Sequence, residues 1–212
     1  MTETQFPINI EITSKWKLSK FHVDLPFTHE ELLEELENET WVNPSMINNL
    51  GNDNWGGVRF KCMNPKPEHT KLNQLKDFFC SDELKHKFVH WLYETDESMN
   101  WDWEWKPDEM CQHTILHGEF SKDMPGFVNV LHTDYRKLVA TGLVYYAKED
   151  NPDLSTVFYD SIDRVNPVRM TTNFGDGWLH SNGNNTWHEG WNKTDKVRYS
   201  TLLGLTLNIK PL

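Results

Sequence analysis

Three residues in the second half of the chain have types and a spacing that suit metal chemistry. His132 and Asp134 are separated by one residue, and His188 follows 56 positions after His132. In a strand, residues two apart face the same side, so the imidazole of His132 and the carboxylate of Asp134 can reach one point. Two histidines and one carboxylate on one side of an ion form the facial triad of non-haem iron sites, which leaves adjacent positions open. We therefore predict that His132, Asp134 and His188 bind a metal ion.

An arginine follows the second histidine, in the strand that we expect at 197–209. Arg198 lies ten residues after His188, and Ser200 shares its strand face, whereas the opposite face of this segment is almost wholly apolar. A guanidinium inside a small barrel is costly unless an anion meets it, and arginine suits bidentate binding of a carboxylate. An anion that reaches both the metal and Arg198 would be a dicarboxylic keto acid, so we predict that Arg198 and Ser200 bind such a group.

The elements that position these residues are strands. From about residue 99, apolar and polar residues alternate with period two, beginning with Trp101, Trp103 and Trp105. Turn signals separate the strands that we expect further along, at 113–120, 127–135, 138–146, 155–159, 177–180 and 197–209. Short strands at this spacing, with no helix between them, predict an antiparallel sandwich or jelly roll.

The first half has helical signals. Thr28 and Glu31 form a capping-box pattern that predicts a helix ending near Asn38. Apolar residues at helical spacing predict a second helical stretch over 68–94, broken near Ser81. The fold class that we expect is therefore mainly β with α: a jelly roll preceded and flanked by N-terminal helices.

No linker or repeat divides the chain, so we expect residues 1–212 to form a single domain. Within it, a mixed, helix-bearing part covers about 1–98 and a β core covers about 99–212. The segment 51–57 has a loop-like composition.

The composition limits the classes of partner. The chain has 21 Lys plus Arg against 32 Asp plus Glu, and the net charge of −11 argues against binding to duplex nucleic acid. No apolar run approaches the ~20 residues that span a bilayer, and the first ten residues show no signal peptide. Three widely spaced cysteines, Cys62, Cys80 and Cys111, indicate a reducing, cytoplasmic compartment.

The pattern His132-x-Asp134, His188 and Arg198-x-Ser200 resembles the 2-oxoglutarate and Fe(II)-dependent oxygenase superfamily. The segments 141–146 and 185–188 also resemble the family's strand after its first ligand pair and its approach to the distal histidine. The resemblance covers about residues 114–209. It implies a double-stranded β-helix, with Fe(II) bound by the two histidines and the aspartate, and with 2-oxoglutarate bound by Arg198 and assisted by Ser200.

The same resemblance implies an activity. The reaction would use O₂ and couple decarboxylation of 2-oxoglutarate to succinate with hydroxylation of a peptidyl residue, an amino acid or a small molecule. The dipeptide Pro125-Gly126 ahead of the first ligand favours a prolyl- or aspartyl-hydroxylase-like enzyme. Gly204 stands where nucleic-acid demethylases carry a second arginine, which again argues against a nucleic-acid substrate.

Other histidines compete as ligands. His180 precedes Arg198 by 18 residues, a spacing unlike the family's, and we interpret it as a lining or structural residue. His86 and His90 have the helical spacing of a zinc motif, but Lys87 replaces the glutamate of that motif, so we expect a solvated helix face. For His113 and His117 we expect a shared strand face without a third ligand.

Two other functions fit parts of the pattern. One is a different metal enzyme on a related barrel, such as a cupin-like dioxygenase or a zinc hydrolase. The other is a non-enzymatic binding module on the same fold. Arg198 argues against the first alternative, because such enzymes need no anion-binding arginine ten residues after the second histidine ligand. The presence of all three ligand residues argues against the second alternative.

Overall fold

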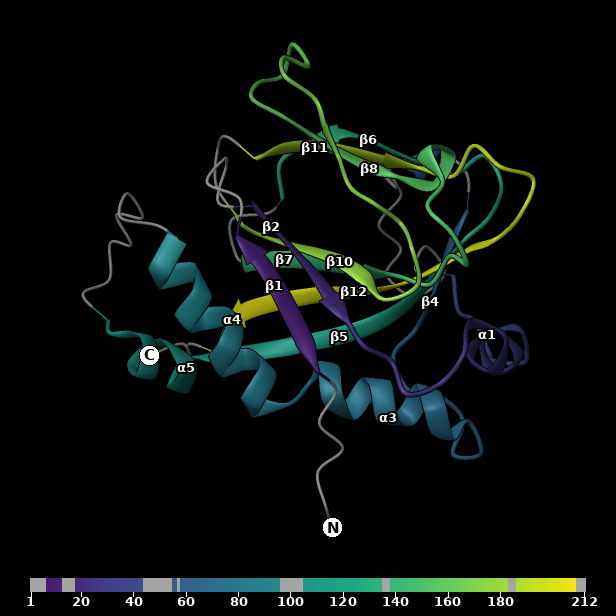
Figure 1. Ribbon diagram of the computed structural model, residues 1–212, viewed down its shortest axis with the longest axis horizontal. Helices are drawn as coiled ribbons and strands as arrows, with labels where there is room; N and C mark the ends of the chain where they lie inside the picture. Colours follow the sequence, from purple (N-terminus) through teal and green to yellow (C-terminus); the bar gives the residue numbers. More distant parts are fainter. Residues whose placement is uncertain are drawn as a thin grey trace.

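The computed structural model describes residues 7–12, 18–43, 55–56, 58–95, 105–134, 138–182 and 186–208. Over these residues the chain forms two β-sheets that face each other, with the α-helices on the far side of the larger sheet (Figure 1). All strand neighbours within the two sheets are antiparallel. The expectation of a mainly β protein with some helices is confirmed.

The larger sheet has seven strands in the order β1-β2-β10-β7-β12-β5-β4. Its members are β1 (Ile8–Ile12), β2 (Leu18–Val23), β4 (Arg59–Cys62), β5 (Thr114–Asp123), β7 (Leu138–Tyr145), β10 (Asp176–Ser181) and β12 (Arg198–Leu207). The strands β1, β2 and β4 come from the first half of the chain, so β2 on β10 and β4 on β5 join the two halves.

The smaller sheet has five strands in the order β3-β6-β11-β8-β9. Its members are β3 (Trp55–Gly56), β6 (Val128–His132), β8 (Thr156–Tyr159), β9 (Val168–Arg169) and β11 (Trp187–Trp191). From β5 to β12 the chain passes back and forth between the sheets and gives four strands to each. The space between the sheets is therefore enclosed mainly by the second half of the chain.

Four α-helices lie in the described ranges: α1 (His29–Glu37), α3 (Thr70–Phe79), α4 (Asp82–Thr95) and α5 (Pro107–Gln112). A short 3₁₀ helix covers Pro152–Leu154. The helices α3, α4 and α5 contact β5, and α1 contacts α3, so they cover the outer face of the larger sheet (Figure 1).

The two faces of the larger sheet bury different cores. Outward residues of β12, including Leu203 and Leu205, pack with the helices in the larger apolar cluster. Inward residues such as Leu143, Tyr145 and Trp178 pack between the sheets in a smaller cluster. This alternation along each strand is what places Arg198 and Ser200 on the inner face.

The helix predictions for the first half are confirmed. The Oγ1 of Thr28 accepts a hydrogen bond from the Glu31 backbone N–H at 3.2 Å, and the Thr28 N–H donates to the Glu31 carboxylate at 2.7 Å. The helix α1 has Asn38 as its C-terminal cap. The second helical stretch is divided into α3 and α4 at Cys80 and Ser81, close to the expected break.

Several local expectations are corrected. Within the loop-like segment 51–57, Trp55–Gly56 forms a short strand, because it pairs with β6. His113 caps the C-terminus of α5 and lies outside β5, so it shares no strand face with His117. Trp105 precedes α5 and is not in a strand, whereas Trp101 and Trp103 lie outside the described residues. Pro107 stands in the first turn of α5, a position that proline favours at the start of helices. The Lys106 N–H donates to the Glu109 carboxylate at 2.9 Å and caps this helix.

None of the helices among the described residues is long and apolar enough to cross a membrane.

Candidate metal centre

The strand pairing brings two distant histidines together. His132 is the last residue of β6, and His188 lies directly opposite it on the neighbouring strand β11. The ring centroids of the two histidines are 4.3 Å apart. Asp134 follows β6 by two residues, so its carboxylate comes to the same place. Pairing of β6 with β11, whose register shifts just after His188, therefore brings together histidines that lie 56 residues apart in the sequence.

The donor atoms of the three residues converge. His132 Nε2 lies 3.5 Å from Asp134 Oδ1, and His188 Nε2 lies 3.8 Å from Asp134 Oδ2. One ligand atom from each residue lies within 4.8 Å of the others. Donors that each approach an ion to about 2 Å have separations of this size. His188 is buried, and His132 and Asp134 are partly exposed, so the cluster can be reached from one side.

Backbone carbonyls fix the tautomer of both histidines. His132 Nδ1 lies 2.7 Å from the Val130 carbonyl, and His188 Nδ1 lies 3.0 Å from the Thr186 carbonyl. A carbonyl oxygen only accepts, so each Nδ1 carries the proton and each Nε2 presents a lone pair to the centre. Metal-binding histidines in proteins are oriented in this way.

His180, for which we expected a lining or structural role, contacts the cluster. This residue of β10 is fully buried, and its Nε2 lies 3.0 Å from Asp134 Oδ2. Its Nδ1 donates to the Ser181 carbonyl at 2.9 Å, and its ring stacks on Trp178. The structural role expected for His180 thus takes a specific form: it holds one oxygen of Asp134.

Burial and charge set the protonation of the cluster. Burial alone would raise the pKa of Asp134, but its contacts with His132 and His180 and the nearby His188 hold that pKa well below its usual value. Burial lowers the pKa of His188 to about 3. The centre therefore offers an ionised carboxylate beside a neutral imidazole, which are the forms that bind metal ions.

A second buried network surrounds Arg198. Asp123 lies opposite Arg198 across β5 and β12 and opposite Arg59 across β5 and β4. Arg198 donates to Asp123 Oδ2 from Nε at 2.9 Å and from Nη2 at 2.5 Å. Arg59 donates to both oxygens of the same carboxylate, at 2.6 and 2.9 Å. The carboxylate that meets Arg198 in this structure is thus supplied by the protein itself.

This network has more guanidinium groups than carboxylates, and two buried hydroxyls lie beside it. Two buried guanidinium groups share one carboxylate, so the row Arg59–Asp123–Arg198 has a net charge of +1. Ser121 and Ser200 lie opposite each other one position further along the same inner face. Both hydroxyls are buried, and neither has a hydrogen-bond partner among the described residues. Two guanidinium groups and two buried hydroxyls on one inner face are groups that suit an anion.

Aromatic side chains connect the two networks. Tyr145 lies opposite Ser200, and its hydroxyl accepts from the Trp178 indole N–H at 3.1 Å. The rings of Trp178 and Phe158 lie 6.0 and 5.0 Å from that of His188. The Nη1 of Arg198 also donates to the Trp191 carbonyl in the strand of His188. The Arg59–Asp123–Arg198 row and the cluster of His132, Asp134 and His188 thus lie in the same interior between the sheets.

The remaining histidines lie elsewhere. His113 stacks on Trp105 with ring centroids 4.3 Å apart. His117 is exposed on β5, with its Nε2 2.9 Å from Thr206 Oγ1. His86 and His90 are exposed on α4, as expected for a solvated helix face. None of these four contributes to the cluster of His132, Asp134 and His188.

No protein-family model matches the chain, and no curated protein matches it in sequence. Solved structures do match its fold. A prolyl hydroxylase from Trichoplax adhaerens, in complex with a hypoxia inducible factor degradation-domain peptide, has a TM-score of 0.60 at 12% identity, over 91% of this chain and 84% of that one. A Pseudomonas putida prolyl-4-hydroxylase has a TM-score of 0.56 at 9% identity, over 91% of this chain and 94% of the other.

A third similar structure is HygX from Streptomyces hygroscopicus, with nickel, 2-oxoglutarate and hygromycin B bound. Its TM-score is 0.51 at 14% identity, over 91% of this chain and 84% of that one. The resemblance to the 2-oxoglutarate and Fe(II)-dependent oxygenases is therefore confirmed at the level of the fold.

Proposed function

We propose that this protein is a 2-oxoglutarate- and Fe(II)-dependent dioxygenase. In this proposal His132, Asp134 and His188 hold Fe(II), and Arg198 and Ser200 hold the distal carboxylate of 2-oxoglutarate. The scaffold is a double-stranded β-helix of the jelly-roll type, formed by β5 to β12, and residues 1–212 act as one domain.

One observation carries the proposal. Two histidines and one carboxylate meet on adjacent strands, with both Nε2 lone pairs directed inward by backbone carbonyls. The donor set, two nitrogens and one oxygen, is that of the 2-His-1-carboxylate iron site. The residues present therefore fit the metal that the fold implies.

The second network supports 2-oxoglutarate as the co-substrate. Its distal carboxylate would offset the net charge of +1 on the Arg59–Asp123–Arg198 row and would accept from the free hydroxyls of Ser121 and Ser200. We include Arg59 and Ser121 in the proposed pocket, although neither was identified from the sequence. Asp123 positions both guanidinium groups rather than touching the co-substrate.

The protein's own groups would bind, orient and exclude water. Bound Fe(II), with 2-oxoglutarate and O₂, supplies the oxidising chemistry that hydroxylates a C–H bond and releases succinate and CO₂. Tyr145, Trp178 and Phe158 form an apolar wall that keeps water from the interior. We propose a peptidyl residue, an amino acid or a small molecule as the substrate, and the three free cysteines fit the reducing, cytoplasmic compartment expected above.

An anaerobic titration tests the proposal. Apo-protein receives Fe(II) and then 2-oxoglutarate while the visible absorbance is recorded. We expect a weak charge-transfer band that requires both additions, because a keto acid chelates iron only at an open facial site. The matched control is His117→Ala, which removes an exposed histidine outside the centre and should leave the band unchanged.

The outcomes separate the alternatives. A band that is lost in His132→Ala and retained in His117→Ala supports the assignment, and succinate release across peptide and metabolite panels then identifies the substrate class. Metal uptake without a band would favour a different metal enzyme on this barrel. No metal uptake would favour a binding module that does no redox chemistry.

A further inference from the structure

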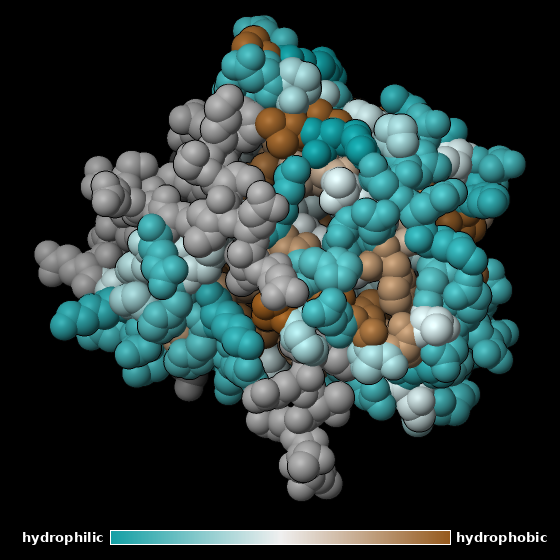
Figure 2. Space-filling model, in the orientation of Figure 1, coloured by the Kyte–Doolittle hydropathy of each residue, from teal (hydrophilic) through white to brown (hydrophobic). Residues whose placement is uncertain are grey.

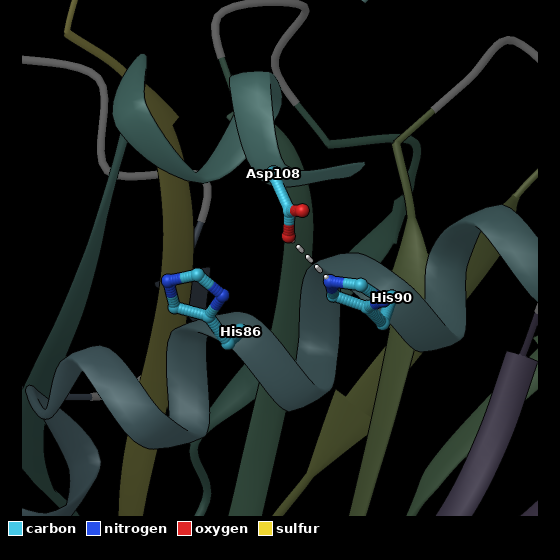
Figure 3. Close-up of side chains that lie close together, drawn as sticks. All are labelled: His86, His90 and Asp108. Carbon is cyan, nitrogen blue, oxygen red and sulfur yellow. Dashed lines mark hydrogen bonds and ion pairs between the residues drawn. The ribbon is translucent and has the colours of Figure 1, made fainter. Parts of the chain in front are cut away.

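A second cluster of side chains that could bind a metal ion lies on the surface, on the helices α4 and α5 (Figure 3). His86 and His90 are one turn apart on α4, and Asp108 comes from the first turn of α5. One ligand atom from each residue lies within 4.8 Å of the others. The sequence showed the histidine pair, but the third ligand arises from how two helices pack.

The packing of α4 and α5 fixes these three residues. The helix α4 buries Leu84, Phe88 and Trp91 in the core, so His86 and His90 lie on its outer side. The helix α5 buries Met110 and Cys111, which leaves Asp108 exposed and facing α4 (Figure 3). The three side chains therefore lie on two helices whose opposite sides are buried in the core.

The cluster is partly organised already. The Nε2 of His90 lies 3.1 Å from Asp108 Oδ1. The rings of His86 and His90 are stacked, with centroids 6.2 Å apart and planes at 23°. Two imidazoles in one orientation and a carboxylate across from them leave room for an ion between the three donors.

Nearby cations are already paired. Lys85 forms an ion pair with Asp82 at 2.6 Å, and Lys87 forms one with Glu83 at 2.8 Å. The two lysines that flank His86 therefore do not present an unbalanced charge to an incoming metal ion, whereas Asp108 attracts it.

We propose that His86, His90 and Asp108 form a surface site for a divalent transition metal of the Zn²⁺ class, completed by water. Two imidazole nitrogens and one carboxylate oxygen are typical ligands of this class. Because the ligands come from α4 and α5, the bound ion would join two helices that are separated in the sequence by residues 96–106. The site does not depend on the proposed function of the buried centre.

The test uses the full chain with His132→Ala, so that zinc bound at the buried centre does not obscure the result. Zinc binding is measured by equilibrium dialysis, and thermal unfolding is followed with and without zinc. We expect about one equivalent of bound zinc and a Tm rise of roughly 5 °C or more at a hundredfold excess over Kd. Adding His86→Ala should weaken zinc binding by roughly 100-fold and remove the rise in Tm.

Two further variants make the test specific. Asp108→Asn keeps both histidines and should lose most of the Tm rise, because the contact between α4 and α5 is lost. His117→Ala removes an exposed histidine elsewhere and should change nothing. Zinc binding that is equal with and without His86→Ala would overturn the site, and an unchanged Tm rise in Asp108→Asn would overturn the joining of the helices.

Discussion

Within the described part of the chain, two clusters each combine two histidines with one carboxylate, but their surroundings differ. His132, Asp134 and His188 meet between two sheets, where backbone carbonyls hold the proton of each histidine on Nδ1. The three residues on α4 and α5 meet at the exposed surface, where His90 contacts Asp108 and the rings of His86 and His90 stack. The comparison indicates that the types of ligand determine whether a metal ion binds. The groups around the ligands determine which role a bound ion can have.

The surroundings differ most in what lies beside the ligands. The buried cluster shares its interior with aromatic rings and with a row of charged side chains that includes Arg198. On the face of the molecule drawn in Figure 2, apolar side chains are visible near the middle among mostly hydrophilic residues. The exposed cluster lies at the surface beside two lysines that are already paired. We therefore expect the first to hold a reactive centre and the second to hold an ion that stabilises local structure.

The largest effect is expected from removing a buried ligand. In His132→Ala, Fe(II) affinity should fall by more than roughly 100-fold, since loss of a ligand exceeds the loss of a supporting group. In His86→Ala, the absorbance band with Fe(II) and 2-oxoglutarate should be unchanged. Anaerobic titration of both variants checks this, and equal loss in the two would contradict the distinction between the clusters.

The next effect concerns stability. Asp123→Asn leaves two buried guanidinium groups without their carboxylate, so the free energy of unfolding should fall by about 3–5 kcal/mol. Its exposed counterpart, Glu83→Gln beside Lys87, should cost less than about 1 kcal/mol. Urea denaturation measures both, and a small cost for Asp123→Asn would show that the charged row contributes little to folding.

The co-substrate pocket gives a binding prediction. Arg198→Ala should leave Fe(II) binding intact but weaken 2-oxoglutarate binding by roughly 10- to 100-fold, because a charge-assisted hydrogen bond is lost. Asp123 keeps Arg59 as a partner in this variant, so the fold should survive. If the protein unfolds and the remaining folded fraction binds 2-oxoglutarate normally, the proposed clamp is wrong.

A residue behind the metal ligands should have a smaller effect. His180→Asn removes the ring that holds one oxygen of Asp134, and Fe(II) affinity should fall by about tenfold. Thermal unfolding of the apo-protein serves as the control, since a positioning role changes metal affinity more than apo stability. An unchanged affinity would mean that Asp134 is oriented without His180.

The smallest effect is expected at a partly exposed ion pair. The hydrogen bond from Arg169 lowers the pKa of Asp150 to about 2 from its ordinary 3.8, although partial burial opposes the shift. The folded state therefore gains stability from the ionised form above the ordinary pKa and loses that gain as pH falls toward 2. Asp150→Asn should reduce stability slightly at neutral pH, and the difference from the parent should shrink in acid denaturation followed between pH 5 and 2.

The sequence was most informative where the signal is local. The capping box of Thr28 and Glu31, the helix break near Ser81 and the alternation along β12 each depend on neighbours within a few residues, and each was recognised. The pair His132 and Asp134 was recognised for the same reason. The family-like spacing to His188 and Arg198 then supplied the long-range part of the site hypothesis.

The contacts that the sequence does not reveal all depend on tertiary pairing. Arg59 reaches Asp123 across 64 positions of sequence, and His180 reaches Asp134 across 46. Asp108 joins His90 because α5 packs on α4. Nothing in the spacing of single residues records which strands become neighbours, so these partners appear only when the sheets are assembled.

The position of β12 has a consequence for how the protein is made. This strand is the last one described, yet it lies between β5 and β7 near the middle of the larger sheet. A ribosome releases the chain from its N-terminus, so β5 and β7 emerge well before the strand that must separate them. The interior of the protein can therefore close only after β12 has emerged, and until then the facing edges of β5 and β7 need protection from pairing with other chains.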